Sequence, residues 1–218
     1  MKNVADERRG HFGSVATPDE RLASLPRVRV VHVPTAGGLV DDPDVPVAVR
    51  RDVELLAGAG TRTVVILDLA DARYAADTLL DMLLPLGAQV RSGRLGDVVL
   101  VVATAQESVA TVAEMLAATY DLPLYVSRSL DDVTHARPVG RLTPTEVASL
   151  AQLGSLGGRV TVSRFAAATD LEQTAAGNRL NNLARRGYVQ RVPRSRRDGD
   201  EYVSVAYFSG STARNAAH

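Results

Sequence analysis

Two kinds of hydrophobic pattern alternate along the first part of the chain. Continuous apolar runs at residues 63–67 and 98–102 indicate strands buried on both faces, and runs at 27–33 and 124–127 predict two further strands. Apolar residues at helical spacing predict the accompanying helices, at residues 47–57, 74–86, 107–120 and 129–136, the last with Ser129 as N-cap. This alternation is typical of an α/β layer with a largely parallel sheet.

The pattern changes after residue 136. Residues 137–142 contain Pro138 and Gly140 and are predicted to link two domains. The run Thr143-Pro144-Thr145-Glu146 then forms a capping box with proline at the first helical position, which predicts the start of a helix. The apolar positions of that helix are Val147, Leu150 and Leu153.

A helix-turn-helix pattern follows. Ser163 is the predicted N-cap of a short helix that ends at Asp170, and a second helix is predicted from residue 173 to 186, before Gly187. Apolar residues at spacings of four and three give this second helix a narrow buried stripe of Ala176, Leu180 and Leu183. The residues predicted to face away from this stripe are Thr174, Gly177, Asn178, Asn181, Asn182 and Arg185.

Two strands with a basic turn between them complete this region. Residues 188–193 and 201–207 alternate like strands, and the connecting run RSRRDGD contains Asp198-Gly199, which favours a hairpin turn. Residues 159–197 carry nine arginines and two acidic residues, a net charge of +7. A patch of this sign attracts phosphate groups.

The run TAAGNRLNNLARRGYVQR followed by a basic hairpin resembles the winged helix-turn-helix domains of the MarR-like regulators, over about residues 142–208. The resemblance implies that the second helix lies in the major groove of duplex DNA and that the wing binds phosphates. Asparagine and glutamine side chains can form paired hydrogen bonds to the edge of adenine, and arginine can form them to guanine. The expected DNA-binding residues are Arg164, Gln173, Thr174, Asn178, Asn181, Asn182, Arg185, Arg186, Arg194, Arg196 and Arg197.

Composition places the chain among ordinary soluble proteins. It has 218 residues, no cysteine and no net charge, but residues 141–218 carry +5 and the preceding part carries −5. The sequence contains no apolar stretch long enough for a membrane span and no apolar signal-peptide core near its start, so a cytoplasmic location is expected. Residues 1–25 and 209–218 are polar and without periodicity, and we expect flexible ends.

Motifs of catalysis or cofactor binding are missing from the sequence. Neither GxGxxG after a strand nor GxxxxGK[ST] occurs, and the four histidines are scattered. Asp41, Asp42 and Asp44 have two interpretations, as ligands of a cation or as acids that complement the start of a helix, and the second is favoured. We therefore expect no enzyme activity, no cofactor and no metal.

The runs VVILDLADARYAADTLLDML and SLDDVTHA, with the order of elements around them, resemble the STAS domain of anti-sigma-factor antagonists and sulphate transporters. The resemblance places Asp68 at a strand end and Asp77 at the position where antagonists carry a phosphorylated serine. Because Asp77 has no hydroxyl group, a serine kinase cannot phosphorylate it, and Thr78 carries the nearby hydroxyl group. The alternative is that both residues only favour a helix start. The expected protein-interaction residues are Asp71, Arg73, Tyr74, Asp77 and Thr78.

Together these patterns predict an α/β fold with a STAS-like domain at residues 26–137 and a winged helix domain at residues 138–208. The predicted function is that of a DNA-binding transcription regulator, a homodimer that binds double-stranded DNA and responds to a regulatory protein partner or signal. The alternative is a partner-switching adaptor related to the anti-sigma-factor antagonists, in which the winged helix docks proteins. The arginine-rich wing favours the first.

Overall fold

The computed structural model describes residues 27–33, 42–57, 62–71, 76–194 and 199–207. We call residues 27–139 the N-terminal half and residues 142–207 the C-terminal half. Some predicted features lie outside the described residues: the two ends of the chain, Arg73 and Tyr74, and Arg196 and Arg197 with the rest of the wing tip.

A sheet of five strands in sequential order forms the N-terminal half. The first four strands are parallel, and the last pairs antiparallel with the fourth. The strands are β1 Arg27–His32, β2 Thr63–Asp68, β3 Val98–Ala103, β4 Leu124–Ser127 and β5 Arg137–Val139. The predicted α/β layer is confirmed, and residues 137–139, predicted as part of a linker, instead form the edge strand β5.

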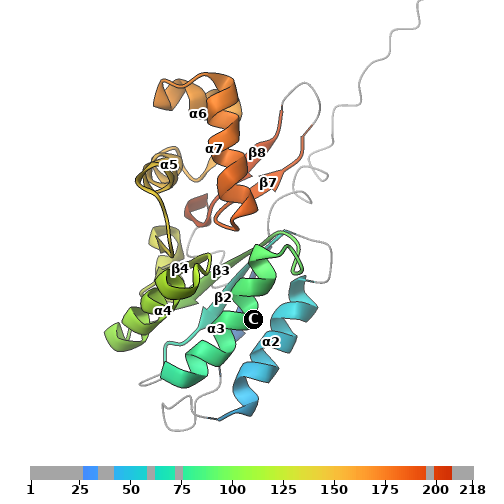
Figure 1. Ribbon diagram of the computed structural model, residues 1–218, viewed down its shortest axis with the longest axis vertical. Coiled ribbons are helices and arrows are strands. Elements are labelled where there is room, and N and C mark those ends of the chain that lie inside the picture. Colours follow the sequence, from blue (N-terminus) through green and yellow to red (C-terminus); the bar gives the residue numbers. More distant parts are fainter. Residues whose placement is uncertain (1–26, 34–41, 58–61, 72–75, 195–198, 208–218) are drawn as a thin grey trace, which may run out of the picture.

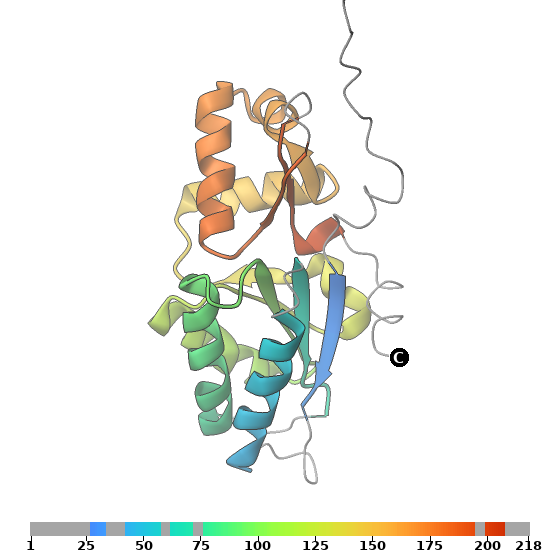
Figure 2. The same cartoon turned by 90° about the vertical axis from the view of Figure 1, so that its right-hand side faces the viewer.

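Three helices cover one face of this sheet (Figures 1 and 2). They are α2 Asp44–Ala57, α3 Ala76–Arg91 and α4 Glu107–Tyr120. Right-handed crossovers between neighbouring parallel strands that advance in one direction place every crossover helix on the same side. Val65 and Leu67 accordingly pack under the helices, while the alternate residues Val64 and Ile66 pack on the opposite face.

The C-terminal half has three helices and a small antiparallel sheet of order β6-β8-β7. The helices are α5 Pro144–Ser155, α6 Val162–Thr169 and α7 Gln173–Arg185, and the strands are β6 Arg159–Thr161, β7 Gln190–Val192 and β8 Glu201–Val203. The 3-10 helix η2, Val205–Tyr207, follows β8 and contacts the 3-10 helix η1, Leu130–His135, of the N-terminal half. This is the architecture of a winged helix.

One hydrophobic cluster runs from the sheet into the winged helix. Its members are fully or almost fully buried, and they come from the face of the sheet opposite α2, α3 and α4 and from the interior of the C-terminal half: among others Val64, Ile66, Val99, Val101, Tyr125, Leu150, Phe165, Leu180, Leu183 and Tyr188. Burial of apolar surface is the main favourable term in folding. The two halves therefore share part of their stability.

The winged helix packs against the edge of the sheet where the parallel strands begin. Gln190 on β7 donates from Nε2 to the carbonyls of Thr63, at 2.9 Å, and Asp97, at 2.6 Å. Arg62 donates from Nε to the carbonyl of Arg191 at 2.6 Å. The strands β2 and β3 start at or next to these carbonyls, so their carboxyl ends lie at the opposite edge, away from the C-terminal half.

A tyrosine pair and a glycine form a second contact between the halves. Tyr125 donates to the carbonyl of Tyr188 at 2.8 Å, and Tyr188 donates to the carbonyl of Val139 at 2.8 Å. Gly140 has φ of +121°, and a Cβ at this position would lie 2.5 Å from the Tyr188 hydroxyl and 2.8 Å from the Leu122 carbonyl. Only glycine combines this conformation with so close an approach.

Helix starts depart from prediction in three places. The predicted α-helix at residues 129–136 is the shorter 3-10 helix η1, and Ser129 occupies the predicted N-cap position, but its side chain makes no cap bond. Ser127 Oγ donates to the Ser129 carbonyl at 2.8 Å. Thr161, not Ser163, caps α6 and accepts from the Arg164 amide at 3.3 Å. Helix α2 starts at Asp44, before the predicted residue 47, because Asp42 accepts from the Asp44 amide at 2.8 Å.

The capping box of α5 is confirmed, since Thr143 Oγ1 accepts from the Glu146 amide and Glu146 accepts from the Thr143 amide. The predicted apolar face is wrong at Val147, which is 48% exposed. The buried face of α5 consists of Glu146, Ser149, Leu150 and Leu153.

Element ends differ elsewhere. Helix α3 continues through Pro85 to Arg91, five residues beyond its predicted end, and both wing strands are shorter than predicted, at residues 190–192 and 201–203. Helix α4 and strand β4 have their predicted bounds.

Candidate functional site

Helix α7 has one buried face and one polar face. Ala176, Leu180 and Leu183 are fully buried, which confirms the predicted stripe. On the opposite side, Thr174, Asn178, Asn181 and Arg185 recur at spacings of four, three and four residues, so they form a line along the helix. All of them are exposed except Asn181, which is half-buried. We call these four residues the polar line.

The turn before α7 fixes the direction of the helix. Asp170 ends α6 in a left-handed conformation with φ of 52°, as predicted, and its amide donates to the carbonyl of Ala166. Gln173 at the start of α7 donates from Nε2 to Ser163 Oγ at 3.3 Å, and Arg164 donates from Nη1 to the carbonyl of Arg159 at 3.3 Å. Both side chains are exposed and lie at the outer end of the winged helix.

Two asparagines of α7 have partners within the C-terminal half. The Tyr202 hydroxyl of β8 donates to Asn181 Oδ1 at 2.7 Å, a bond that uses the amide oxygen and not the amide nitrogen. Asn182 donates from Nδ2 to Glu146 Oε1 at 2.8 Å. These bonds tie α7 to β8 on one side and to α5 on the other. They orient the amides, and they turn Asn182 toward the protein.

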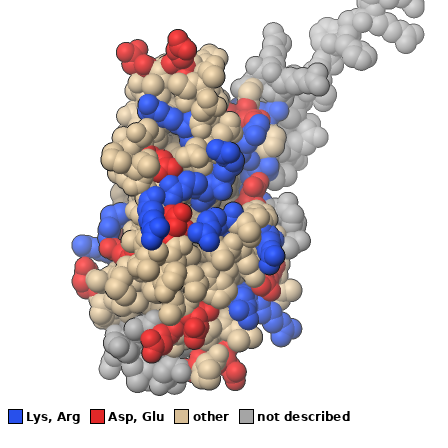
Figure 3. Space-filling model, viewed as in Figure 1, with Lys and Arg blue, Asp and Glu red and all other residues tan. Residues whose placement is uncertain are grey.

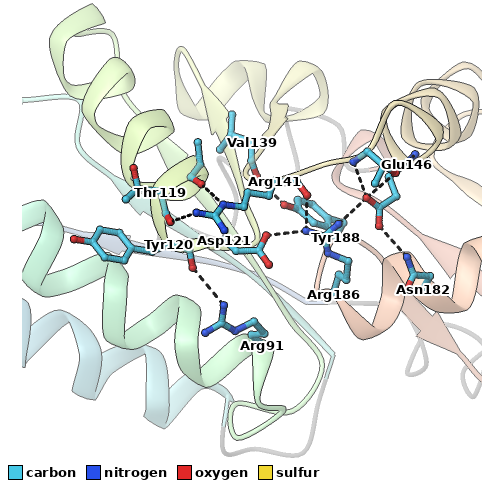
Figure 4. A network of polar contacts seen from close by, with 12 residues as sticks. Arg91, Thr119, Tyr120, Asp121, Val139, Arg141, Glu146, Asn182, Arg186 and Tyr188 are labelled. Atoms are coloured by element: carbon cyan, nitrogen blue, oxygen red, sulfur yellow. Dashed lines mark hydrogen bonds and ion pairs between the residues drawn. The ribbon is translucent and has the colours of Figure 1, made fainter.

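Arg186 is held at the junction of the two halves (Figure 4). Its guanidinium contacts Glu146 Oε2 at 2.6 Å and Asp121 Oδ1 at 2.8 Å, and donates to the carbonyl of Arg141 at 2.8 Å. The same group lies 5.5 Å from the centre of the Tyr188 ring. Arg186 was expected to bind DNA, but its donors are occupied inside the protein, and we leave it and Asn182 out of the contact surface proposed below.

The titration of Glu146 depends on this junction. Burial acts to raise the pKa of the carboxyl, but hydrogen bonds from Arg186 and Thr143 act in the other direction and prevail, so the pKa lies below the ordinary value of 4.5. Tyr188 is fully buried, and burial raises the pKa of its hydroxyl to about 12. Both groups keep one protonation state near neutral pH.

Two other arginines, Arg159 and Arg194, stabilise the wing through Glu201. Glu201 on β8 lies between Arg159, at 2.6 Å, and Arg194, at 2.9 Å, and Arg159 also stacks on the Tyr207 ring at 5.5 Å from its centre. Arg194 is exposed although it is paired. The base of the wing is therefore anchored by charge to β6.

The described residues predicted to contact proteins, Asp71, Asp77 and Thr78, lie at the end of the N-terminal half that is remote from the winged helix. Helix α3 begins there and runs toward α7, as Figure 1 shows. Asp71 and Asp77 are exposed and Thr78 is half-buried. Asp68, at the end of β2, accepts from the Ala70 amide and lies 2.8 Å from Nδ1 of His32.

Among the described residues, no group of three or more His, Cys, Asp or Glu side chains is arranged to hold a metal ion. Within the same residues, no helix is long and apolar enough to cross a membrane.

The helix pair α6 and α7, the supporting helix α5 and the β7–β8 hairpin define the C-terminal half as a winged helix-turn-helix domain. Residues 142–199 match the MarR family. No curated protein and no solved structure matches the chain. The family match does not include the N-terminal half, and the STAS-like interpretation of that half stays a prediction.

Several functional contacts had no signal in the sequence. Glu146 was recognised as a cap, but its bonds to Arg186 and Asn182 join residues 40 and 36 positions apart. Arg179 of α7 lines a cleft of about 300 Å³ between α5 and α7, together with Asn178 and Thr145. Periodicity reports which face is buried and not which long-range partner a polar residue meets.

We predict that Glu146→Gln destabilises the protein at neutral pH by about 1–3 kcal/mol, because Arg186 loses one of its two charged acceptors. A lowered pKa means that folding favours the carboxylate. This contribution is therefore complete above pH 4.5 and is lost as the pH falls through the folded value.

Urea unfolding of the parent and of Glu146→Gln at about pH 7 and about pH 3 measures the effect, with Glu107→Gln on α4 as the exposed control. The difference between parent and variant should shrink in acid. A difference of equal size at both pH values would contradict the role of the carboxylate.

Proposed function

We propose that the protein is a DNA-binding transcription regulator, in which α7 enters the major groove of duplex DNA. The observation that carries this proposal is the polar line on α7, opposite the fully buried stripe and directly after the α6 turn. The match of residues 142–199 to the MarR family supports it. So does the net charge of +7 over residues 159–197.

The chemistry of the polar line suits base edges. Asparagine can bond in pairs to adenine and arginine to guanine, and the threonine methyl suits thymine. Asn178 is exposed near the middle of α7, and Asn181 keeps its amide nitrogen free of the bond to Tyr202. We propose that Thr174, Asn178, Asn181 and Arg185 include the base-reading residues.

Other residues supply phosphate contacts in this proposal. Arg164 and Gln173 lie at the outer end of the helix pair, and Arg194 lies at the base of the wing. Arg196 and Arg197 belong to the wing tip, which lies outside the described residues. Contacts of this kind are independent of sequence and weaken with salt.

We propose that the N-terminal half is a STAS-like association domain. It is joined to the winged helix at the edge where its strands begin, so the edge where its strands end is free of the C-terminal half. Open parallel sheets present their functional loops at that second edge. Asp71, Asp77 and Thr78 lie there.

A single winged helix contacts a short stretch of groove, and regulators of this kind commonly pair two modules on half-sites about one helical turn apart. We therefore propose a homodimer, formed through the N-terminal half. Asp77 lies at the start of α3, and this end of the helix is remote from α7 (Figure 1), so a dimer formed there would leave both α7 helices accessible to DNA.

Asn178→Ala should weaken binding to a duplex selected from a random library by about 1–3 kcal/mol and leave binding to unselected duplex unchanged, because a base contact is lost. Fluorescence anisotropy on both duplexes measures this, with Gln106→Ala at the start of α4 as a remote amide control. Equal losses on the two duplexes would rule out base reading by Asn178.

The same titrations separate the wing from the helix. Replacement of Arg194, Arg196 and Arg197 by alanine should weaken binding to both duplexes and flatten the salt dependence by about 0.9 for each lost phosphate contact. No binding of the parent protein to any duplex, at low salt, would contradict the proposed function itself.

The homodimer has its own test. We expect the parent to be a dimer by light scattering and Asp77→Lys to shift it toward monomer, because the new charge lies in the interface. Asp52→Lys on α2 is the control, since Asp52 is also exposed. A parent that is monomeric both free and on DNA would contradict the dimer.

A further inference from the structure

We propose that the N-terminal half supplies part of the DNA-binding surface: Arg91 and Arg94, next to the end of α7, bind the phosphate backbone that flanks the groove occupied by α7. The inference rests on the proposed function. It adds to the winged helix a contact from a part of the chain whose net charge is negative.

The turn after α3 lies against the end of α7. Residues from both elements line one cleft of about 380 Å³, with Arg91, Ser92 and Gly93 on one side and Ala184, Arg185 and Gly187 on the other. The approach is close, since a Cβ on Gly187 would lie 2.7 Å from Cγ1 of Val90. Gly187 has φ of +81°, so a side chain there is disfavoured on both counts. The surface of the turn after α3 and the surface of the end of α7 therefore adjoin each other at this cleft.

Arg91, Arg94 and Arg185 are exposed, and none of the ion pairs among the described residues includes them. Arg91 donates to the carbonyl of Tyr120 and Arg185 to Asn182 Oδ1, each at 3.3 Å, so the acceptors of these two bonds are neutral groups.

Other arginines nearby are compensated. Arg186 pairs with Glu146 and Asp121, Arg191 pairs with Asp200, and Arg62 lies 3.4 Å from Asp97, the acidic residue that also lines the cleft. Figure 3 shows arginine side chains gathered where the two halves meet, with acidic side chains at the opposite end of the N-terminal half. The negative net charge of this half therefore does not describe its surface next to α7.

Distances along the helix place this patch at the backbone of a bound duplex. A helix rises about 1.5 Å per residue, so Arg185 lies about 10 Å beyond Asn178 along α7. The major groove is about 12 Å wide and is bounded by phosphates. When Asn178 lies over the groove, the end of α7 lies at its edge. Arg91 lines the cleft at that end, Arg94 belongs to the same turn, and arginine forms two parallel bonds to phosphate.

The test is the salt dependence of DNA binding by the full chain carrying Arg91→Gln and Arg94→Gln. The control carries Arg51→Gln and Arg128→Gln, which remove the same charge from exposed positions on α2 and after β4. The slope of log K against log salt should fall by about 1.8 in the test variant, on selected and unselected duplex alike, because two phosphate contacts are lost. The control should keep the slope of the parent.

A slope equal to that of the parent would overturn this inference and leave the proposed function standing. A parent that binds no duplex would overturn both. The variant Arg91→Lys with Arg94→Lys keeps both charges and should keep most of the slope, so a fall of equal size in that variant would also contradict a phosphate contact.

A second measurement does not depend on removing charge. The chain has no cysteine, so Ser92→Cys gives a single attachment point for an iron chelate that cleaves nearby DNA. Cleavage should fall beside the half-site protected by α7. The same chelate on Ser108→Cys, at the exposed start of α4, should cleave nothing. Bound DNA that remains intact next to position 92 would overturn the inference.

Discussion

The bonds that Arg186 makes to Glu146 and Asp121 help to fix the orientation of the C-terminal half relative to the sheet. Arg186 follows α7 directly, Glu146 opens α5, and Asp121 ends α4 of the other half, so one guanidinium joins three helices. The group is half-buried and stacked on Tyr188. Loss of both carboxylates would leave an uncompensated charge at the junction, which is costly away from water. The direction of α7 relative to the sheet follows from this contact.

The shared core extends the same constraint. Val64, Ile66 and Val101 lie on the face of the sheet opposite α2, α3 and α4, and they belong to one hydrophobic cluster with Leu180 and Leu183 of α7. In the account proposed above, the N-terminal half therefore supports the winged helix through this cluster and adds arginines beside α7. The opposite edge of the sheet is left for association. The two roles are separated by the length of the parallel strands.

Sequence patterns predicted what depends on neighbours along the chain. Continuous apolar runs predicted β2 and β3, and the stripe of Ala176, Leu180 and Leu183 predicted the buried face of α7. The sequence did not reveal that Arg186 turns inward, because its partners are 40 and 65 residues away. The sequence also indicated a negative net charge for the N-terminal half, but a net charge does not show where on the surface the charged side chains lie. The arginines next to α7 were therefore missed. One predicted cap was misplaced by two residues, since Thr161 and not Ser163 caps α6.

Amide hydrogen exchange of the full chain, with and without saturating duplex DNA, tests most directly whether α7 reads DNA as part of one body with the sheet. We expect exchange at residues 190–192 and 137–139 to be slow in both states, because these strands form the junction. DNA should slow exchange in α7 and in residues 91–97 and leave α2 unchanged. Unchanged exchange throughout α7, with DNA shown to be bound, would contradict the account.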